Sequence, residues 1–258
     1  MKRLLICLFV ATLVLSCGKG KDTPKKEMTA IKITPVERTE EMEKPQIKIV
    51  SPKADEVLKT SKLAVQLTVE GYDLGKVTDN PRAKEIANSG KGQHVHVIVD
   101  NKPYEACYEV GKPFELPGEL EPGAHTLRVF PSRSYHESLK GGGWDAVNFY
   151  VEKKEGTPAD LTQPTLTYSR PKGTYKGDDT KSIMVDFWLS NCTLSEDGFK
   201  VRLTIDGANE TLLTDWKPYF VSGLTMGKHT FELELIDKDG QAVAGPFNKT
   251  AREVSLEP

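Results

Sequence analysis

The chain has 258 residues, and its 35 Lys and Arg against 37 Asp and Glu give a formal net charge of -2 at pH 7. A mildly acidic chain offers no basic footprint for nucleic acid, so we expect no nucleic-acid partner. The length suffices for about two folded domains of roughly 100 residues each.

The first 16 residues have the pattern of a secretory signal peptide. Lys2 and Arg3 precede an apolar run over residues 4–15, and Cys17 follows after a serine. An apolar run of about a dozen residues is too short to span a bilayer comfortably, and no later run is long enough to do so. Loss of the leader removes the two charges of Lys2 and Arg3, so the net charge becomes -2 - 2 = -4.

The end of this leader, Val14-Leu15-Ser16-Cys17, resembles the lipobox of bacterial lipoproteins. In that family the cysteine is lipidated, palmitate included, and becomes the mature N-terminus. The resemblance therefore implies lipidation at Cys17 and a partner membrane. Gly18 follows where an Asp tends to hold such proteins at the inner membrane, which favours the cell outer membrane. Leu15 stands where a smaller residue is more usual; the alternatives are an ordinary signal peptide or an N-terminal anchor helix.

Residues 17–45 are predicted to be the lipidated cysteine and a flexible tether. The stretch is rich in charge and proline and has almost no apolar periodicity. Such a segment buries too little apolar surface to offset the entropy of ordering it. Its expected role is to space the folded part from the lipid.

From residue 46 onward the pattern is all-β. Short runs alternate apolar and polar residues, and turn residues separate them about every ten positions, which is typical of a β-sandwich. No run has helical periodicity. The clearest strand candidates cover residues 47–50, 63–69, 95–99 and 126–130.

Segments of the first half recur in the same order in the second half, which indicates an internal duplication. Each copy resembles a bacterial immunoglobulin-like domain in its opening Pro, its G-x-H-T start of a late strand and, in the second copy, the turn over residues 237–240. The resemblance implies two tandem immunoglobulin-like β-sandwich domains, 46–155 and 159–258, and it specifies fold rather than function. The matched segments are 51–53 with 170–172, 63–69 with 183–189, 94–100 with 200–206, 112–114 with 217–219, and 120–127 with 224–231.

The duplication predicts which face of one strand is buried. Val95, Val97 and Val99 align with apolar residues of the second copy, so we expect them to face the core. His94 and His96 then share the opposite face, where the second copy has two cations, and this favours a solvated polar face. Residues i and i+2 on a strand lie only about 6.5–7 Å apart, so the two imidazoles could also bind one metal ion.

Two long loops distinguish the first copy, the insert over residues 75–90 and the glycine-flanked loop over residues 131–143. In a sandwich of this topology we expect both at one end, near His94 and His96, and loops on a rigid scaffold often carry binding sites. Three hypotheses follow: the loops only pack onto the sandwich, or they bind an anionic or sugar ligand, or they bind Zn or Cu. The ligand hypothesis names Arg133, Tyr135 and Glu137, and the metal hypothesis names His94, His96 and His136.

Catalytic motifs are not convincing. Residues 136–140 begin like the zinc-protease motif but end in Lys and adjoin a glycine run, and G-x-S-x-G does not occur. We therefore expect no enzyme, but a lipid-anchored cell-envelope protein acting as a non-catalytic binding or structural module for an unknown envelope ligand or protein, with its site at the loop-rich end of the first domain. The alternative is a periplasmic or surface-facing metal-binding protein that uses His94, His96 and His136.

Two cysteines and two further histidines are not expected to belong to the site. Cys107 and Cys192 are not at equivalent positions, and sequence does not decide whether they pair; Cys107 is predicted on a wet face, where a free thiol would be a further soft-metal ligand. His125 and His229 are equivalent in the two copies, which predicts a shared structural role, such as donating to a turn carbonyl.

Overall fold

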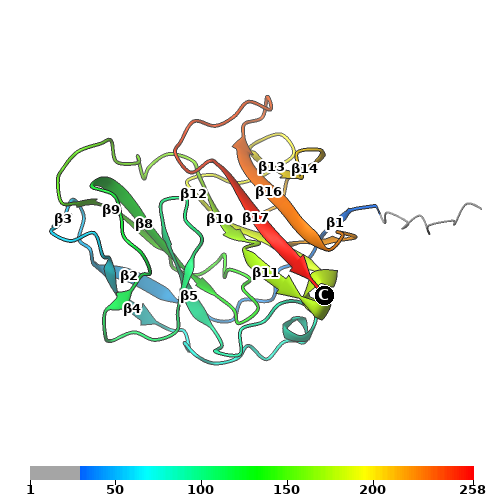
Figure 1. The fold of residues 1–258 in the computed structure, drawn as a ribbon, viewed down its shortest axis with the longest axis horizontal. Coiled ribbons are helices and arrows are strands. Elements are labelled where there is room, and N and C mark those ends of the chain that lie inside the picture. The colour runs from blue at the N-terminus through cyan, green and yellow to red at the C-terminus, as the bar shows by residue number, and fades with distance from the viewer. Residues whose placement is uncertain (1–29) are drawn as a thin grey trace, which may run out of the picture.

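The computed structural model describes residues 30–258, which form an all-β molecule of two packed sandwiches (Figure 1). The signal peptide, Cys17 and the start of the tether lie outside these residues. The helical elements of the described part are two short 3-10 turns, η1 (Pro81–Lys84) and η2 (Gly177–Lys181). No helix between residues 30 and 258 is both long and apolar enough to cross a membrane.

The first sandwich pairs a three-stranded sheet, in the order β2-β4-β7, with a five-stranded sheet, in the order β3-β9-β8-β5-β6. Its strands are β2 (Gln46–Ser51), β3 (Val57–Leu58), β4 (Ala64–Glu70), β5 (His94–Val99), β6 (Glu105–Cys107), β7 (Phe114–Glu115), β8 (Gly123–Ser132) and β9 (Asp145–Val151).

The second sandwich pairs a four-stranded sheet, in the order β1-β15-β12-β10, with a five-stranded sheet, in the order β11-β17-β16-β13-β14. Its strands are β1 (Lys32–Pro35), β10 (Thr165–Arg170), β11 (Gly173–Lys176), β12 (Ile183–Ser190), β13 (Lys200–Ile205), β14 (Asn209–Leu213), β15 (Tyr219–Ser222), β16 (Gly227–Ile236) and β17 (Lys249–Glu257).

The inward residues follow the predicted alternation. Val95, Val97 and Val99 are fully buried in the core of the first sandwich, and their counterparts on β13 are buried in that of the second. Equivalent positions also share local detail, because His125 bonds Asp100 and His229 bonds Asp206, in each case with ring Nδ1 2.7 Å from the carboxylate. The duplication is therefore visible at the level of individual hydrogen bonds.

The C-terminal part of the predicted tether belongs to the fold, which corrects the expectation for residues 30–45. Strand β1 pairs antiparallel with β15 of the second sandwich, and in Figure 1 it lies beside strands from the opposite end of the colour scale. Ile31 and Ile33 pack against the second core, which gives this charged stretch an apolar side to bury. Residues 36–45, called the strap below, then cross to the first sandwich.

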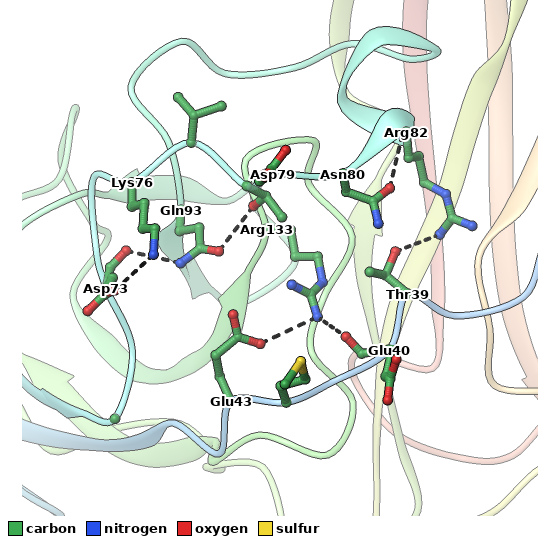
Figure 2. A pocket seen from close by; sticks show the side chains of 14 residues that line it. Thr39, Glu40, Glu43, Asp73, Lys76, Asp79, Asn80, Arg82, Gln93 and Arg133 are labelled. Carbon is green, nitrogen blue, oxygen red and sulfur yellow. Dashed lines mark hydrogen bonds and ion pairs between the residues drawn. The ribbon is translucent and has the colours of Figure 1, made fainter.

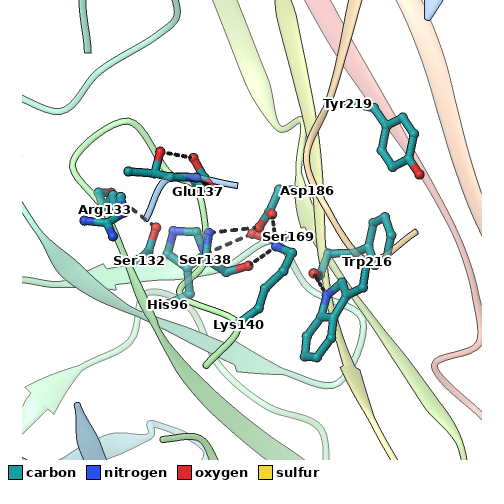
Figure 3. A network of polar contacts seen from close by, with 12 residues as sticks. His96, Ser132, Arg133, Glu137, Ser138, Lys140, Ser169, Asp186, Trp216 and Tyr219 are labelled. Atoms are coloured by element: carbon teal, nitrogen blue, oxygen red, sulfur yellow. Dashed lines mark hydrogen bonds and ion pairs between the residues drawn. The ribbon is translucent and has the colours of Figure 1, made fainter. Parts of the chain in front are cut away.

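The two sandwiches pack face to face through β5 and β8 of the first and β10 and β12 of the second. Phe130 stacks on Trp188 with ring centroids 5.0 Å apart, and Lys140 forms a fully buried ion pair with Asp186, with Nζ 2.6 Å from the carboxylate (Figure 3). This packing corrects the predicted solvated face of β5. The face is buried because the second sandwich covers it, which a single-domain strand pattern does not reveal.

Candidate trihistidine metal site

Three histidines meet where the two sandwiches join. His94 and His96 project from the outer face of β5, and His136 comes from the turn that follows β8. Nε2 of His94 lies 3.1 Å from Nε2 of His96 and 3.1 Å from Nδ1 of His136, and one nitrogen from each ring lies within 4.8 Å of the others. All three side chains are buried. No fourth His, Cys, Asp or Glu of residues 30–258 joins this group.

Hydrogen bonds hold each ring in place. Nδ1 of His94 lies 2.9 Å from the carbonyl oxygen of Gly92, which only accepts, so Nδ1 carries the proton and Nε2 presents its lone pair to the centre. Nδ1 of His96 bonds the hydroxyl of Ser169 on β10 at 3.0 Å. Such bonds on the outer ring nitrogen fix the ring orientation of metal-binding histidines.

Tyr104 packs against two of the three rings. Its ring is nearly parallel to that of His96, with centroids 3.5 Å apart and 9° between the planes, and its hydroxyl lies 3.1 Å from Nδ1 of His136. The stacking prevents the His96 ring from turning. The Tyr104 hydroxyl lies within hydrogen-bond distance of the His136 ring.

The surroundings keep the imidazoles uncharged. Burial is the first cause that lowers the pKa of all three, for His94 to about 4 and for His96 and His136 well below the usual 6.5. Neighbouring positive charges on Arg170 and Lys172 act in the same direction. Neutral imidazole is the form that binds metal ions, so the rings are ready to bind at neutral pH.

Three converging ring nitrogens are a ligand set that can hold one metal ion. The single lone pair on Nε2 of His94 faces two other ring nitrogens at 3.1 Å, so it makes at best a shared hydrogen bond with both. An ion bound by the three nitrogens would satisfy all of them at once. Zn and Cu accept imidazole nitrogens at about 2.0–2.1 Å, and a small shift of the rings would provide that distance.

The insert and the long loop lie side by side, as predicted. The backbone nitrogen of Ser89 donates to the carbonyl oxygen of Ser134 at 2.8 Å. Tyr135 and Glu137, which flank His136, are occupied by the strap: Thr39 donates its backbone NH to Glu137 at 2.8 Å and bonds the Tyr135 hydroxyl at 2.8 Å. Arg82 of the insert also pairs with Glu137. These two side chains therefore position the loop that carries His136.

Arg133 is the member of the predicted ligand-binding set that faces a groove, shown in Figure 2. The groove has a volume of about 470 Å³ and lies between the strap and the insert. Its lining is polar and of both charges, since Arg133 bonds the strap carbonyl of Glu40 and lies beside Glu43, with Asp73 and Lys76 opposite. Tyr135 and Glu137 do not line it, so the three residues do not share one ligand face.

The residues left out of the site have other roles. Cys107 and Cys192 are both free, and Cys107 is buried in the first core, which corrects its predicted place on a wet face. His125 and His229 bond the turn carbonyls of Glu121 and Thr225, as predicted.

Sequence reasoning missed Tyr104 and the contributions of the second sandwich. Ser169 and Arg170 are the last two residues of β10 and Lys172 follows it, all in the second copy, and no spacing pattern links them to the histidines.

Comparison with known proteins finds remote structural likenesses. No family model matches the chain, and no curated protein matches it. Among solved structures, the fibronectin(III)-like modules of Clostridium thermocellum CbhA are 14% identical, with 82% of this chain and 94% of that chain covered and a TM-score of 0.28.

Two further structures show the same level of likeness. The Bacteroides ovatus protein SGBP-B of a mixed-linkage glucan utilization locus, in complex with a mixed-linkage heptasaccharide, is 12% identical; 82% of this chain matches 47% of that one, with a TM-score of 0.23. A two-domain fibronectin type III segment of chicken tenascin is 9% identical over 82% of this chain and 98% of that chain, with a TM-score of 0.22. Independently of these likenesses, the strand topology makes residues 30–258 an all-β protein of two β-sandwiches.

Gly92, whose carbonyl oxygen orients His94, should not tolerate a side chain. Its φ is +89°, and a Cβ there would lie 2.5 Å from the backbone of Gly75. We expect Gly92→Ala to lower the free energy of unfolding by roughly 1–3 kcal/mol in urea titrations. Gly90→Ala is the matched control, because a Cβ at Gly90 meets no atom within 4 Å. Equal stability of the two variants would contradict this account.

The metal-free protein should lose stability in acid. The folded-state pKa of His94, about 4, lies below the unfolded value of 6.5, so between these pH values the unfolded chain binds more protons and stability falls as pH falls. With three such rings the slope reaches up to about 4 kcal/mol per pH unit. Urea midpoints at pH 7.5, 6 and 5 measure it, and His136→Asn should flatten the slope. An unchanged slope in that variant would show that His136 titrates normally.

Proposed function

We propose that the protein is a non-catalytic, lipid-anchored protein of the cell envelope that binds one Zn or Cu ion through His94, His96 and His136. The observation that carries this proposal is the convergence of three buried, uncharged imidazoles, two of them 3.1 Å from the third. The ring nitrogens contact one another in this structure, and a single ion bound to all three would replace these ring-to-ring hydrogen bonds.

Within this proposal, Tyr135 and Glu137 hold the loop that carries His136 against the strap. Ser169 holds His96 from the second sandwich, so the site needs both sandwiches. The second sandwich therefore serves as one wall of the centre.

Cell-envelope anchoring rests on the leader and the resemblance of Val14-Leu15-Ser16-Cys17 to a lipobox. Gly18 supports the outer membrane as the destination. Strand β1 begins at Lys32, so residues 18–31 would lie between the lipidated cysteine and this strand.

Metal binding is tested with the purified protein and the His136→Asn variant. The φ of His136 is +69°, a conformation that Asn tolerates better than most residues, so this substitution removes a ligand with little backbone cost. We expect the wild type to retain about one Zn or Cu per chain in elemental analysis and the variant to retain little. At a metal concentration 1,000 times the Kd, the ion adds about 4 kcal/mol and raises Tm by roughly 8–16 °C in the wild type alone.

His229→Asn is the matched control, because it removes a buried imidazole that bonds Asp206 in the second sandwich. This variant should bind metal as the wild type does. Equal metal content in the wild type and His136→Asn would refute the trihistidine centre, whichever ion is used.

Anchoring is tested separately with Cys17→Ser expressed in a Gram-negative host. The wild type should fractionate with the outer membrane and incorporate labelled palmitate, and the variant should do neither. Palmitate incorporation at an unchanged level in Cys17→Ser would exclude this cysteine as the lipid attachment site.

A further inference from the structure

Positive charges of the second sandwich adjoin the trihistidine centre. Arg170 and His136 line the same small cavity, of about 10 Å³, and the Arg170 guanidinium carbon lies 5.4 Å from the centroid of the Tyr104 ring. Nζ of Lys172 lies 4.0 Å from that centroid and donates to the Tyr104 carbonyl oxygen. The Tyr104 ring in turn stacks on His96, so both cations stand one aromatic ring away from the metal position.

Negative charge near the centre is already paired. Glu137 accepts hydrogen bonds from Thr39 and Arg82, and Asp186 is held by Lys140. Glu105 partly offsets Lys172, whereas the groups of the described residues that favour the charge of Arg170 are the hydroxyls of Tyr104 and Tyr175. The His136 ring contacts the Tyr104 hydroxyl, and burial raises the pKa of that tyrosine. The donors at the centre are therefore neutral.

We propose that the trihistidine centre selects a monovalent ion, Cu(I), over divalent Zn(II). This inference rests on the proposed metal-binding function and names the ion that the site takes. Cu(I) and Zn(II) both have filled d shells, so ligand-field preferences do not separate them. Charge and coordination number decide between them.

Both factors favour Cu(I). The cost of burying an ion among neutral ligands rises steeply with its charge, and repulsion by Arg170 and Lys172 is twice as large for a divalent ion as for a monovalent one. Zn(II) in proteins is almost always four-coordinate, so beside the three imidazoles it would need a water or the Tyr104 hydroxyl as a fourth ligand in this buried setting. Cu(I) is stable with three nitrogen ligands.

The test compares the two ions on the purified full-length protein without oxygen. Cu(I) is kept reduced with ascorbate and its affinity is measured by competition with bicinchoninate, while Zn(II) is measured by competition with a chromophoric chelator. We expect Cu(I) to bind at least about tenfold more tightly than Zn(II). When both are offered at equal buffered free concentrations, copper should occupy the site.

Lys172→Gln supplies a second, quantitative readout. Removing one positive charge relieves twice as much repulsion for Zn(II) as for Cu(I), so an about threefold gain in Cu(I) affinity implies an about ninefold gain for Zn(II). Lys181→Gln is the control, because Lys181 is exposed and pairs with Asp178 at the surface; neither affinity should change. Melting curves of the metal-free variants verify that each is folded.

Zn(II) binding as tight as that of Cu(I) in the wild type would overturn the selectivity while leaving the metal site intact. An equal gain for both ions in Lys172→Gln would equally overturn it, because charge would then not be the selecting factor. Binding of neither ion would overturn the trihistidine proposal itself.

Discussion

The outer face of β5 carries two imidazoles that can be buried only because the second sandwich supplies their covering and one of their hydrogen-bond partners. Polar groups removed from water need such partners, and His96 finds one in Ser169, across the junction between the sandwiches. Around this point the junction is completed by aromatic stacking of Phe130 on Trp188 and by the buried pair of Lys140 and Asp186. Burial raises the pKa of Asp186, and the ammonium group beside it opposes that change. The candidate site is therefore a property of the junction.

The loop that carries His136 is fixed from three directions. It returns from β8, it is bonded by the insert through Ser134, and the strap closes over it through Thr39. Charged side chains contribute to this fixation. Arg82 and Glu137 form an ion pair with little exposure, and Arg133 donates a hydrogen bond to the backbone carbonyl of Glu40. Fixing the loop in this way positions His136 within bonding distance of His94, in a conformation with positive φ that an isolated loop would rarely adopt.

Much of the fold was accessible from the sequence, because alternation and duplication are local signals. Val95, Val97 and Val99 face the core as their pattern predicts, and His125 and His229 act alike. The convergence of the two long loops also followed from sandwich topology. The burial of His94 and His96 did not, since their aligned cations in the second copy argued for a wet face. Whether the outer face of a strand is exposed to solvent depends on whether another domain packs on it. The sequence of the strand alone does not indicate this packing. For the same reason, the contributions of Tyr104, Ser169 and the strap to the site were not predicted from the sequence.

Strand β1 adds a constraint on the order of assembly. It is the first described strand in the chain, yet it pairs with β15. The backbone of Lys32 can therefore form its strand pairing only after Ser222 has been made. A chain secreted from its N-terminus would thus complete the first sandwich with its histidines uncovered, and would close around them only when the last third had emerged. The histidine-bearing face of β5 would stay open to solvent during that interval, so the three rings become buried only when the second sandwich docks.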